Sequence, residues 1–304
     1  MVTTLNAVIQ EIAKRYQLDD RQFVCVGGFY NQVFSNGVQI IKYFHENQVD
    51  LAQMEHEIDV MTYMNKRGIL SANVIYSKQQ RMIEEIDCQG ERYFCFVKSK
   101  VEGETIAVVD LSSTHVFQWG AQIGSIHHAG KDYRSQYQLG HWHEEPIVHT
   151  APSVFDDTLK VGWLNVTRQL DSFPRNDSNY GLIHHDLHHE NIRFSNEKAA
   201  VLDFESAIQH WYVYDLAIAI YHAALHIEKP KRPDWYKWFS STMLEGYESR
   251  FSLEKKWVDK LSFFIYYRQW YSYLYFDTYL EKNQHVLQIL DKMKSYLVAE
   301  KSII

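Results

Sequence analysis

The stretch "GLIHHDLHHENI", residues 181–192, places four histidines, an aspartate, a glutamate and an asparagine within eight consecutive positions. His184 and His188 are four residues apart, as are His185 and His189. On a helix each pair would share one face, as the paired ligands of a zinc protease do. Zinc binding would also need a third ligand, and the order of residues is not HExxH. The histidine spacing alone therefore leaves zinc as one interpretation.

The same segment also has the form His-x-Asp-Leu-x-x-x-Asn, the catalytic-loop pattern of kinases, with Asp186 as base and Asn191 as magnesium ligand. Twelve residues after Asn191, the strand-like run "AAVLDFE" contains Asp203, and Asp215 follows after twelve more. The intervening residues have the length of a hairpin that could deliver Asp203 to a metal. Carboxylate and amide oxygens suit magnesium, whereas zinc prefers histidine, so the downstream pattern favours magnesium.

Composition excludes several classes of protein. The chain has 304 residues, 46% hydrophobic and 23% charged, which is typical of a globular protein with a sizeable core. The net charge of −7 and the scattered Lys and Arg argue against nucleic acid or a membrane as partner and suit a cationic substrate. The first residues lack the pattern of a signal peptide, and no apolar run approaches ~20 residues, so we expect a cytoplasmic protein. Three cysteines indicate neither disulfides nor a cysteine metal site.

A change of periodicity along the chain predicts its organisation. A helix is expected near residues 4–16 and another over 48–67, ended by Gly68. Strand-like runs, one with a hairpin turn at Asn36-Gly37, fill most of the remaining sequence up to residue 101. From about residue 112 onward the pattern is mostly helical. The predicted class is α+β, a small sheet with one helix followed by a larger helical lobe.

The segments "LIHHDLHHENIRF" and "AAVLDFESAIQHWYVYDLA" resemble the signature of the aminoglycoside phosphotransferase and choline kinase-like family of small-molecule kinases. "GGFYNQVF", "IIKYF" and "WGAQIGSIHHAGKDY" extend the resemblance over most of the chain, less specifically. Two positions depart from the usual pattern: His185 stands where Gly is usual, and Glu205 where Asp or Gly is common. The resemblance implies a two-lobed, protein-kinase-like fold, with a nucleotide-binding lobe at residues 1–97 and a helical substrate lobe at 98–304.

The resemblance also implies ATP and Mg²⁺ as cofactors and a small-molecule hydroxyl as acceptor. Asp186 would accept the proton of that hydroxyl, and Asn191 and Asp203 would bind the magnesium ion. Lys42 would bind the α- and β-phosphates. Its partner should lie on the 48–67 helix, and the apolar stripe of that helix widens toward Glu57, which favours Glu57 over Glu55.

Further residues of the nucleotide site follow from the resemblance only. The loop "GGFYN" would cover the phosphates through the backbone around Gly28, with Asn31 fixing the loop. The backbone from Ser99 to Val101 would hydrogen bond the adenine, and Gly103 supports a bend there. Asp215 would hold the catalytic loop from the start of a helix.

Two features bear on the acceptor. The run "FFIYYRQWYSYLYF", residues 263–276, could enclose a quaternary ammonium, although aromatic residues at helical spacing more often form the core; Arg268 within it could pair with a carboxylate or a substrate anion. We expect an acceptor that carries an amine, bound by acidic side chains that precede the catalytic loop; the alternative is that these acids are solvated loop residues. The candidates are Glu144, Glu145, Asp156 and Asp157.

Two alternative functions remain at this point. The acceptor could be a protein Ser or Thr, as for some bacterial proteins of this appearance, or the chain could be a nucleotide-binding scaffold without catalysis. The presence of Lys42, Asp186, Asn191 and Asp203 together speaks against the scaffold. Neither the acceptor nor the oligomeric state follows from the sequence.

Overall fold

The computed structural model describes residues 2–18, 22–28, 32–135, 137, 140–195, 198–299 and 301–304. The chain forms two compact units. The first comprises Met1–Gly103 and the short segment Ala200–Glu205, and the second comprises Glu104–Ala199 and Ser206–Ile304. The boundary predicted between residues 97 and 98 lies inside a strand, whereas the contacts divide the chain after Gly103.

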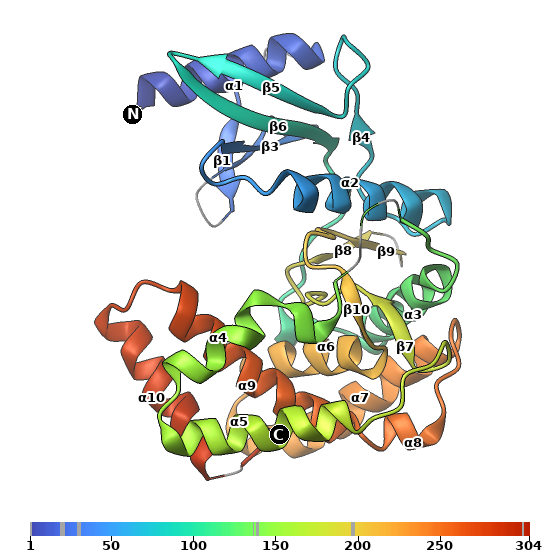
Figure 1. The fold of residues 1–304 in the computed structure, drawn as a ribbon. Helices are drawn as coiled ribbons and strands as arrows, with labels where there is room; N and C mark the ends of the chain where they lie inside the picture. Colours follow the sequence, from blue (N-terminus) through green and yellow to red (C-terminus); the bar gives the residue numbers. More distant parts are fainter. Residues whose placement is uncertain are drawn as a thin grey trace. The chain divides into compact units, whose positions relative to one another are not determined.

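An antiparallel sheet forms the centre of the first unit (Figure 1). The strands follow the order β1-β2-β3-β6-β4, and β5 pairs with β6. The hairpin turn predicted at Asn36-Gly37 is confirmed, because it joins β2 to β3 and the Asn36 side chain accepts the backbone N–H groups of Val38 and Gln39. The strands are β1 (Val24–Gly27), β2 (Val33–Ser35), β3 (Gln39–His45), β4 (Val74–Ile75), β5 (Ile83–Cys88) and β6 (Glu91–Ser99).

Two helices pack on opposite sides of this sheet, α1 (Val2–Tyr16) and α2 (Leu51–Lys66) (Figure 1). Successive side chains of a strand point to opposite faces, so Ile41 joins the core under α1 while its neighbour Lys42 points toward α2. Asp50 caps the start of α2 by accepting the N–H of Gln53, and Gly68, at a φ of 86°, follows its end. Both helices predicted for this part of the chain are therefore confirmed.

The second unit is mostly helical, as predicted. Two short antiparallel sheets accompany its helices: β7 pairs with β10, and the predicted hairpin after residue 191 is formed by β8 and β9. Strand β10 was not predicted from the sequence. The strands are β7 (Tyr180–Ile183), β8 (Ile192–Ser195), β9 (Lys198–Val201) and β10 (Ile208–Trp211). The helices are α3 (Ser113–Gly130), α4 (Pro146–Val154), α5 (Asp157–Asp171), α6 (Val213–Leu225), α7 (Arg232–Glu248), α8 (Lys255–Val258), α9 (Leu261–Tyr279) and α10 (Gln284–Val298), with 3-10 turns at η1 (Val108–Asp110), η2 (Trp142–Glu144) and η3 (Lys229–Lys231).

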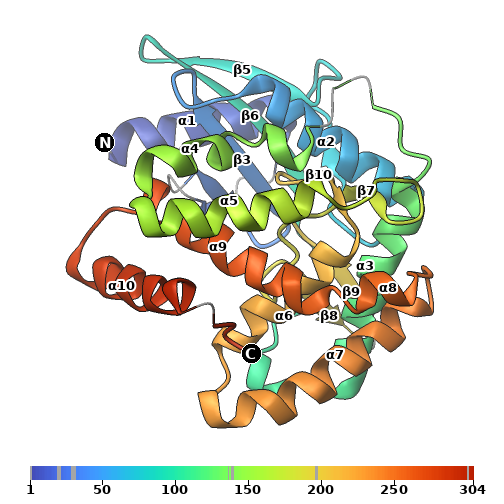
Figure 2. The same cartoon turned by 60° about the horizontal axis from the view of Figure 1, so that its bottom comes forward.

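Helices α3 and α7 lie side by side with their backbones in contact (Figure 2). A Cβ atom at Gly120 would overlap the carbonyl oxygen of Met243, and one at Gly246 would overlap that of Phe117. Only glycine allows this close approach. Helix α6 packs between this pair and α9. Most residues of α6 are buried in the core of the unit. Among the described residues, no helix is both long and apolar enough to cross a membrane.

Candidate active site

The histidine-rich loop follows β7 and is held by a single buried carboxylate on α6. Asp215 Oδ2 accepts the backbone N–H of His184 at 2.8 Å, and its Oδ1 accepts that of His185 at 2.7 Å. His127 of α3 contacts Oδ2 through Nε2 at 3.1 Å, and its Nδ1 lies 2.9 Å from the hydroxyl of Tyr247. Burial would raise the pKa of Asp215, but these hydrogen bonds and nearby histidines lower it overall. The carboxylate thus fixes the loop without facing a substrate.

His185 occupies the loop position where the family pattern has glycine. Its φ of 70° lies in the left-handed region, which a side chain adopts only at a cost of about 1–2 kcal/mol. The imidazole is buried, and its ring lies 5.4 Å from that of Tyr271 and 5.6 Å from that of Tyr214. Packing of this ring therefore offsets a backbone strain that glycine would avoid.

Both oxygens of Asp186 have partners in the second unit. Oδ1 lies 3.3 Å from Arg268 Nη2, while Oδ2 lies 3.2 Å from Asn191 Nδ2 and 3.5 Å from His188 Nε2. Asn191 Nδ2 also donates to the Asp186 carbonyl at 2.9 Å. Burial alone would raise the pKa of Asp186, but the hydrogen bond from His188 and the charge of Arg268 hold it well below its usual range. Asp186 is therefore a carboxylate at neutral pH.

Asp186 forms part of the wall of a cavity of about 290 Å³ within the second unit. The catalytic loop, α6 and α9 supply most of the wall. The aromatic run of residues 263–276 thus has two roles, because part of it is buried core while other members face the cavity. The lining residues are His185, Asp186, His188, Ser206, His222, Arg268, Tyr271, Ser272, Tyr275 and Phe276.

A cluster of charges lies at the α2 side of the sheet in the first unit. Lys42 Nζ lies 2.8 Å from Glu57 Oε2, so the ion pair expected from the helical stripe is present. The same ammonium lies 2.5 Å from Glu205 Oε2 and 3.8 Å from Asp203 Oδ1. Burial would lower the pKa of Lys42, but these three carboxylates raise it overall, so the lysine stays charged.

The sequence did not indicate two members of this cluster. Lys98 of β6 places Nζ 3.0 Å from Glu57 Oε1, so each oxygen of that carboxylate is paired with a different lysine. Glu205 departs from the family pattern, and the sequence left open whether it is a third carboxylate at the metal. Burial and two neighbouring carboxylates raise its pKa, although Lys42 opposes this. Alternation along β6 could have placed Lys98 on the α2 face, but nothing local predicts its partner.

Two of the other predicted nucleotide-binding residues, Gly28 and Ser99, lie at or next to the end of a strand. Gly28 has a φ of 91°, and a Cβ atom there would lie 2.6 Å from Gln32 Oε1, so both the backbone conformation and the adjacent Gln32 side chain favour glycine. The backbone N–H of Ser99 donates to Asn73 at 2.8 Å, and that of Lys100 to Val38, which leaves Val101 as the remaining candidate for an adenine donor. Asn31 lies outside the described residues.

Most of the acidic side chains proposed for an amine have local structural partners. Glu144 accepts the N–H of His141, and Asp156 caps α5 and pairs with Lys294. Asp157 is exposed, 3.8 Å from Lys160 one turn along α5. These contacts explain three of the four acids without a substrate.

Glu145 differs from the other three because it is mostly buried. Its Oε2 accepts the hydroxyl of Tyr271 at 2.8 Å, and its Oε1 lies 3.6 Å from His185 Nε2. Tyr271 and His185 both line the cavity. Burial raises the pKa of Glu145 from 4.5 to about 8, so the side chain is protonated at neutral pH unless a cation binds nearby.

The pKa of Glu145 leads to a prediction about stability. The folded protein keeps a proton on Glu145 that the unfolded chain releases above pH 4.5, so its contribution to stability is full below that pH and is lost as the pH rises through about 8. The glutamine of Glu145→Gln cannot ionise. The free energy of unfolding of this variant, relative to that of the parent, should therefore be about 2–4 kcal/mol higher at pH 9 than at pH 5. Urea unfolding of both proteins at the two pH values measures this.

Glu144→Gln is the matched control, because the pKa of exposed Glu144 is lowered by its hydrogen bond from His141 and Glu144 stays ionised across this range. If the free energies of unfolding of Glu145→Gln and the parent differed by the same amount at pH 5 and at pH 9, the raised pKa of Glu145 would be contradicted.

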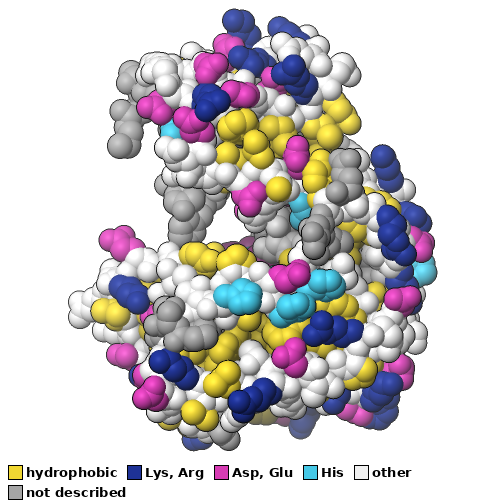
Figure 3. All heavy atoms as spheres, viewed as in Figure 1, with side chains coloured by type: hydrophobic (Ala, Val, Ile, Leu, Met, Phe, Trp, Pro, Cys, Tyr) yellow, Lys and Arg dark blue, Asp and Glu magenta, His cyan; other side chains and the backbone are white. Residues whose placement is uncertain are grey.

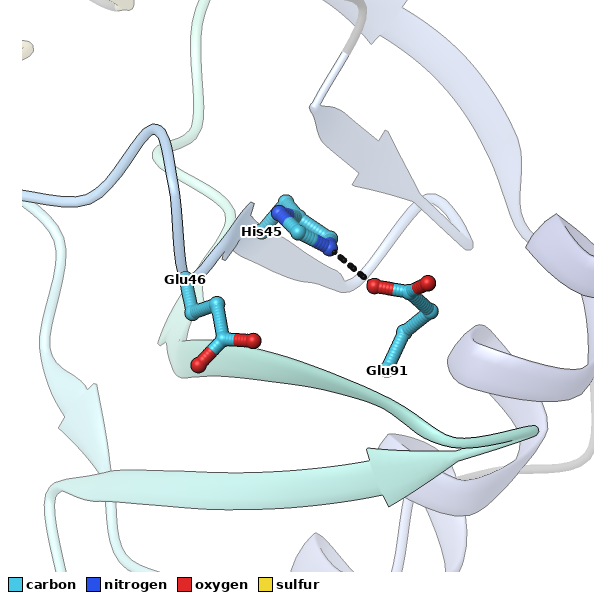
Figure 4. A group of neighbouring side chains, drawn as sticks. All are labelled: His45, Glu46 and Glu91. Atoms are coloured by element: carbon cyan, nitrogen blue, oxygen red, sulfur yellow. Dashed lines mark hydrogen bonds and ion pairs between the residues drawn. The ribbon is translucent and has the colours of Figure 1, made fainter.

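Two groups of side chains among the described residues bring three potential metal ligands within 4.8 Å of one another, and neither contains a histidine of the loop. One is Glu57, Asp203 and Glu205; the other is His45, Glu46 and Glu91. In the second group, His45 points toward Glu91 with 2.7 Å between Nε2 and Oε2, and Glu46 lies to one side (Figure 4). His45 Nδ1 also accepts the N–H of Asn47, and Arg92 pairs with Glu46. Protein partners therefore account for this group.

Histidines also gather on one face of the second unit (Figure 3). Elsewhere in that unit His141 stacks on His143 at 5.7 Å and on Tyr180 at 5.9 Å, and its Nδ1 lies 3.0 Å from the Tyr180 hydroxyl. This ring stacking and hydrogen bonding account for His141 without a metal.

The family model of the phosphotransferase enzyme family matches residues 27–257. The chain therefore belongs to this family and is a kinase-like small-molecule phosphotransferase, which confirms the predicted family and fold class. Amicoumacin kinase of Bacillus subtilis (strain 168) is 25% identical over 263 residues, covering 83% of this chain and 78% of that protein.

Two solved structures show the same fold. Amicoumacin kinase hAmiN, in complex with AMP-PNP, Ca²⁺ and Ami, has a TM-score of 0.88 at 20% identity, covering 98% of this chain and 94% of that one. The microcompartment-associated aminopropanol kinase has a TM-score of 0.78 at 16% identity, covering 97% and 95%.

Proposed function

We propose that this protein transfers the γ-phosphate of ATP, with Mg²⁺, to a hydroxyl of a small molecule that carries an amine. The main observation in support is Asp186, a carboxylate fixed on the wall of a cavity and held by partners on both of its oxygens. A base in this position can accept the hydroxyl proton as the new O–P bond forms and the bond from the γ-phosphorus to ADP breaks.

Lys42 and Asp203 are the residues that we assign to the nucleotide and its metal in the first unit. Carboxylate oxygens of Asp203 and Glu205 lie within 4.8 Å of one another, beside the Lys42–Glu57 ion pair, and such hard oxygen donors fit Mg²⁺. Lys42 carries its charge beside them and suits a phosphate. We assign Asn191 as a further ligand from the sequence pattern. Bound Mg²⁺ would neutralise phosphate charge during transfer.

Glu145 is the side chain that we assign to the amine of the acceptor. An ammonium within about 4 Å of a carboxylate gains about 1–4 kcal/mol, depending on screening, and would draw Glu145 into its charged form. The name of one related kinase agrees with this chemistry, because aminopropanol kinase is named for an amine-bearing alcohol. No contact of the described residues favours a protein Ser or Thr as acceptor.

We expect ATP with Mg²⁺ to stabilise the protein against heat, and zinc alone to have little effect. A ligand at 100 times its Kd adds about 2.7 kcal/mol to the free energy of unfolding. Differential scanning fluorimetry with ATP, Mg²⁺, both together, or Zn²⁺ measures this. Stabilisation by micromolar zinc without any response to ATP would show that the histidine loop is a metal site instead.

The test of the acceptor class is a phosphate-transfer screen with ATP and Mg²⁺. It should include aminopropanol, an aminoglycoside, amicoumacin, homoserine, a sugar acid and a generic protein substrate. We expect transfer to an amine-bearing alcohol and none to the protein. Preference for the sugar acid would reject the amine while leaving the kinase assignment, and absence of transfer to every acceptor would reject the proposed function.

A further inference from the structure

Arg268 of α9 is a buried cation in the wall of the acceptor cavity and the sole charged residue of the aromatic run 263–276. We propose that Arg268 is a positioning residue for phosphate transfer: its guanidinium fixes the carboxylate of Asp186 in the orientation that receives the acceptor hydroxyl. This inference rests on the proposed function, and it concerns a residue whose role the sequence pattern left open.

The guanidinium is held on several sides. Nη2 reaches Asp186 Oδ1 at 3.3 Å, and Nη1 lies 3.5 Å from the carbonyl oxygen of His185. Nε and Nη2 both point at His222 Nε2, at 3.2 and 2.9 Å. The group also lies over the ring of Tyr271, 5.0 Å from its centroid. Arg268 therefore has little rotational freedom, which is what a residue that orients another must have.

His222 contributes by presenting an acceptor nitrogen. Two N–H groups of Arg268 converge on its Nε2, so this nitrogen carries a lone pair and the imidazole is neutral. Burial and then the charge of Arg268 lower the pKa of His222 well below its ordinary value, in agreement with that geometry. Arg268 thus meets one charged acceptor, Asp186, and two neutral ones.

These contacts restrict the Asp186 carboxylate from both ends. Arg268 occupies Oδ1, while Asn191 lies on the side of Oδ2. A buried guanidinium carries a large desolvation penalty, which a hydrophobic residue of similar volume would avoid. The Arg268 guanidinium lies beside the proposed base Asp186 in the wall of the cavity. This position favours a role in orienting the Asp186 carboxylate. A purely structural ion pair between the loop and α9 is the alternative that the experiment must exclude.

The experiment measures kcat and the KM for ATP with the best acceptor of the screen, in the parent, Arg268→Met and Arg268→Lys. Misplacing a catalytic group by about 1 Å can cost on the order of 100-fold in rate, so Arg268→Met should lower kcat by about 100-fold with the KM for ATP unchanged. Arg268→Lys keeps the positive charge but not the planar guanidinium group, so its kcat should fall by less. Gln269→Met is the matched control: Gln269 is the next residue, is also buried, and bonds the backbone of Lys301 and Ile303.

A double-mutant cycle separates positioning from structure. If Arg268 acts through Asp186, adding Arg268→Met to Asp186→Asn should lower the rate by less than about 3-fold further. Soluble guanidinium should restore at least about a tenth of the parent rate to Arg268→Ala. Independent, multiplying losses in the cycle would overturn the proposal, as would a parent-like kcat in Arg268→Met.

Stabilisation by ATP and Mg²⁺ shows whether a variant is folded. ATP and Mg²⁺ should stabilise Arg268→Met as they stabilise the parent; if that variant does not fold, Arg268→Lys and the guanidinium rescue of Arg268→Ala decide. A parent that transfers phosphate to none of the acceptors overturns the proposed function and this inference together. An active parent with an equally active Arg268→Met overturns the role of Arg268 alone.

Discussion

Replacing Asp186 by asparagine should lower kcat by about 10²- to 10⁴-fold, the usual share of a positioned base. The amide keeps nearly the volume of the carboxylate and can still accept from Arg268, so the fold and nucleotide binding should persist. It cannot take up the hydroxyl proton. Steady-state kinetics with the best acceptor and calorimetric titration with AMP-PNP measure the two properties separately.

Glu190→Gln is the control for this variant, because Glu190 is an exposed acid of the same loop. It should retain the parent kcat. An Asp186→Asn protein with the same turnover as the parent would mean that the base is another residue and that the loop pattern has been misread.

Asp203→Ala should abolish most of the gain in nucleotide affinity that Mg²⁺ provides. Loss of a residue that only supports a metal ligand costs about 10- to 100-fold in metal affinity, so loss of a ligand itself should cost at least about 100-fold. The loss of nucleotide affinity should appear only when Mg²⁺ is present. Without Mg²⁺, removing a carboxylate 3.8 Å from Lys42 takes away a competitor for its ammonium, so metal-free nucleotide binding should not fall.

Titration of AMP-PNP with and without Mg²⁺, in Asp203→Ala and in the parent, tests this contrast. Asp87→Ala, which removes an exposed acid of β5, is the control and should match the parent in both conditions. Equal losses of affinity with and without metal would instead indicate that Asp203→Ala disturbs the fold of the first unit.

Features with local causes could be predicted from the sequence. The helix stripe selected Glu57 over Glu55, and the structure buries Glu57 beside Lys42 while Glu55 stays exposed. Asp186 and Asn191 could be found because a fixed spacing within one loop brings them together. The family and the α+β, two-lobed class followed from these same segments and are confirmed by the comparisons.

Features that depend on contacts between distant segments could not be predicted. Arg268 is 82 residues from Asp186, and Lys98 is 41 from Glu57; no periodicity relates such pairs. The prediction for the acidic stretches gave Glu145 the same role as Asp156, whereas the structure shows that Asp156 caps α5. Burial, which separates these two acids, is a property of the folded chain.

The hold of Asp215 on two successive amides has an evolutionary consequence. The shape of the loop is maintained by α3, α6 and α7, through side chains that are not part of the cavity wall. The cavity position Phe276 has no polar side-chain atom and takes no part in these hydrogen bonds, so it can change without disturbing the loop. Descendants of one ancestral enzyme can therefore exchange acceptors through substitutions on α9 while inheriting an unchanged reaction centre.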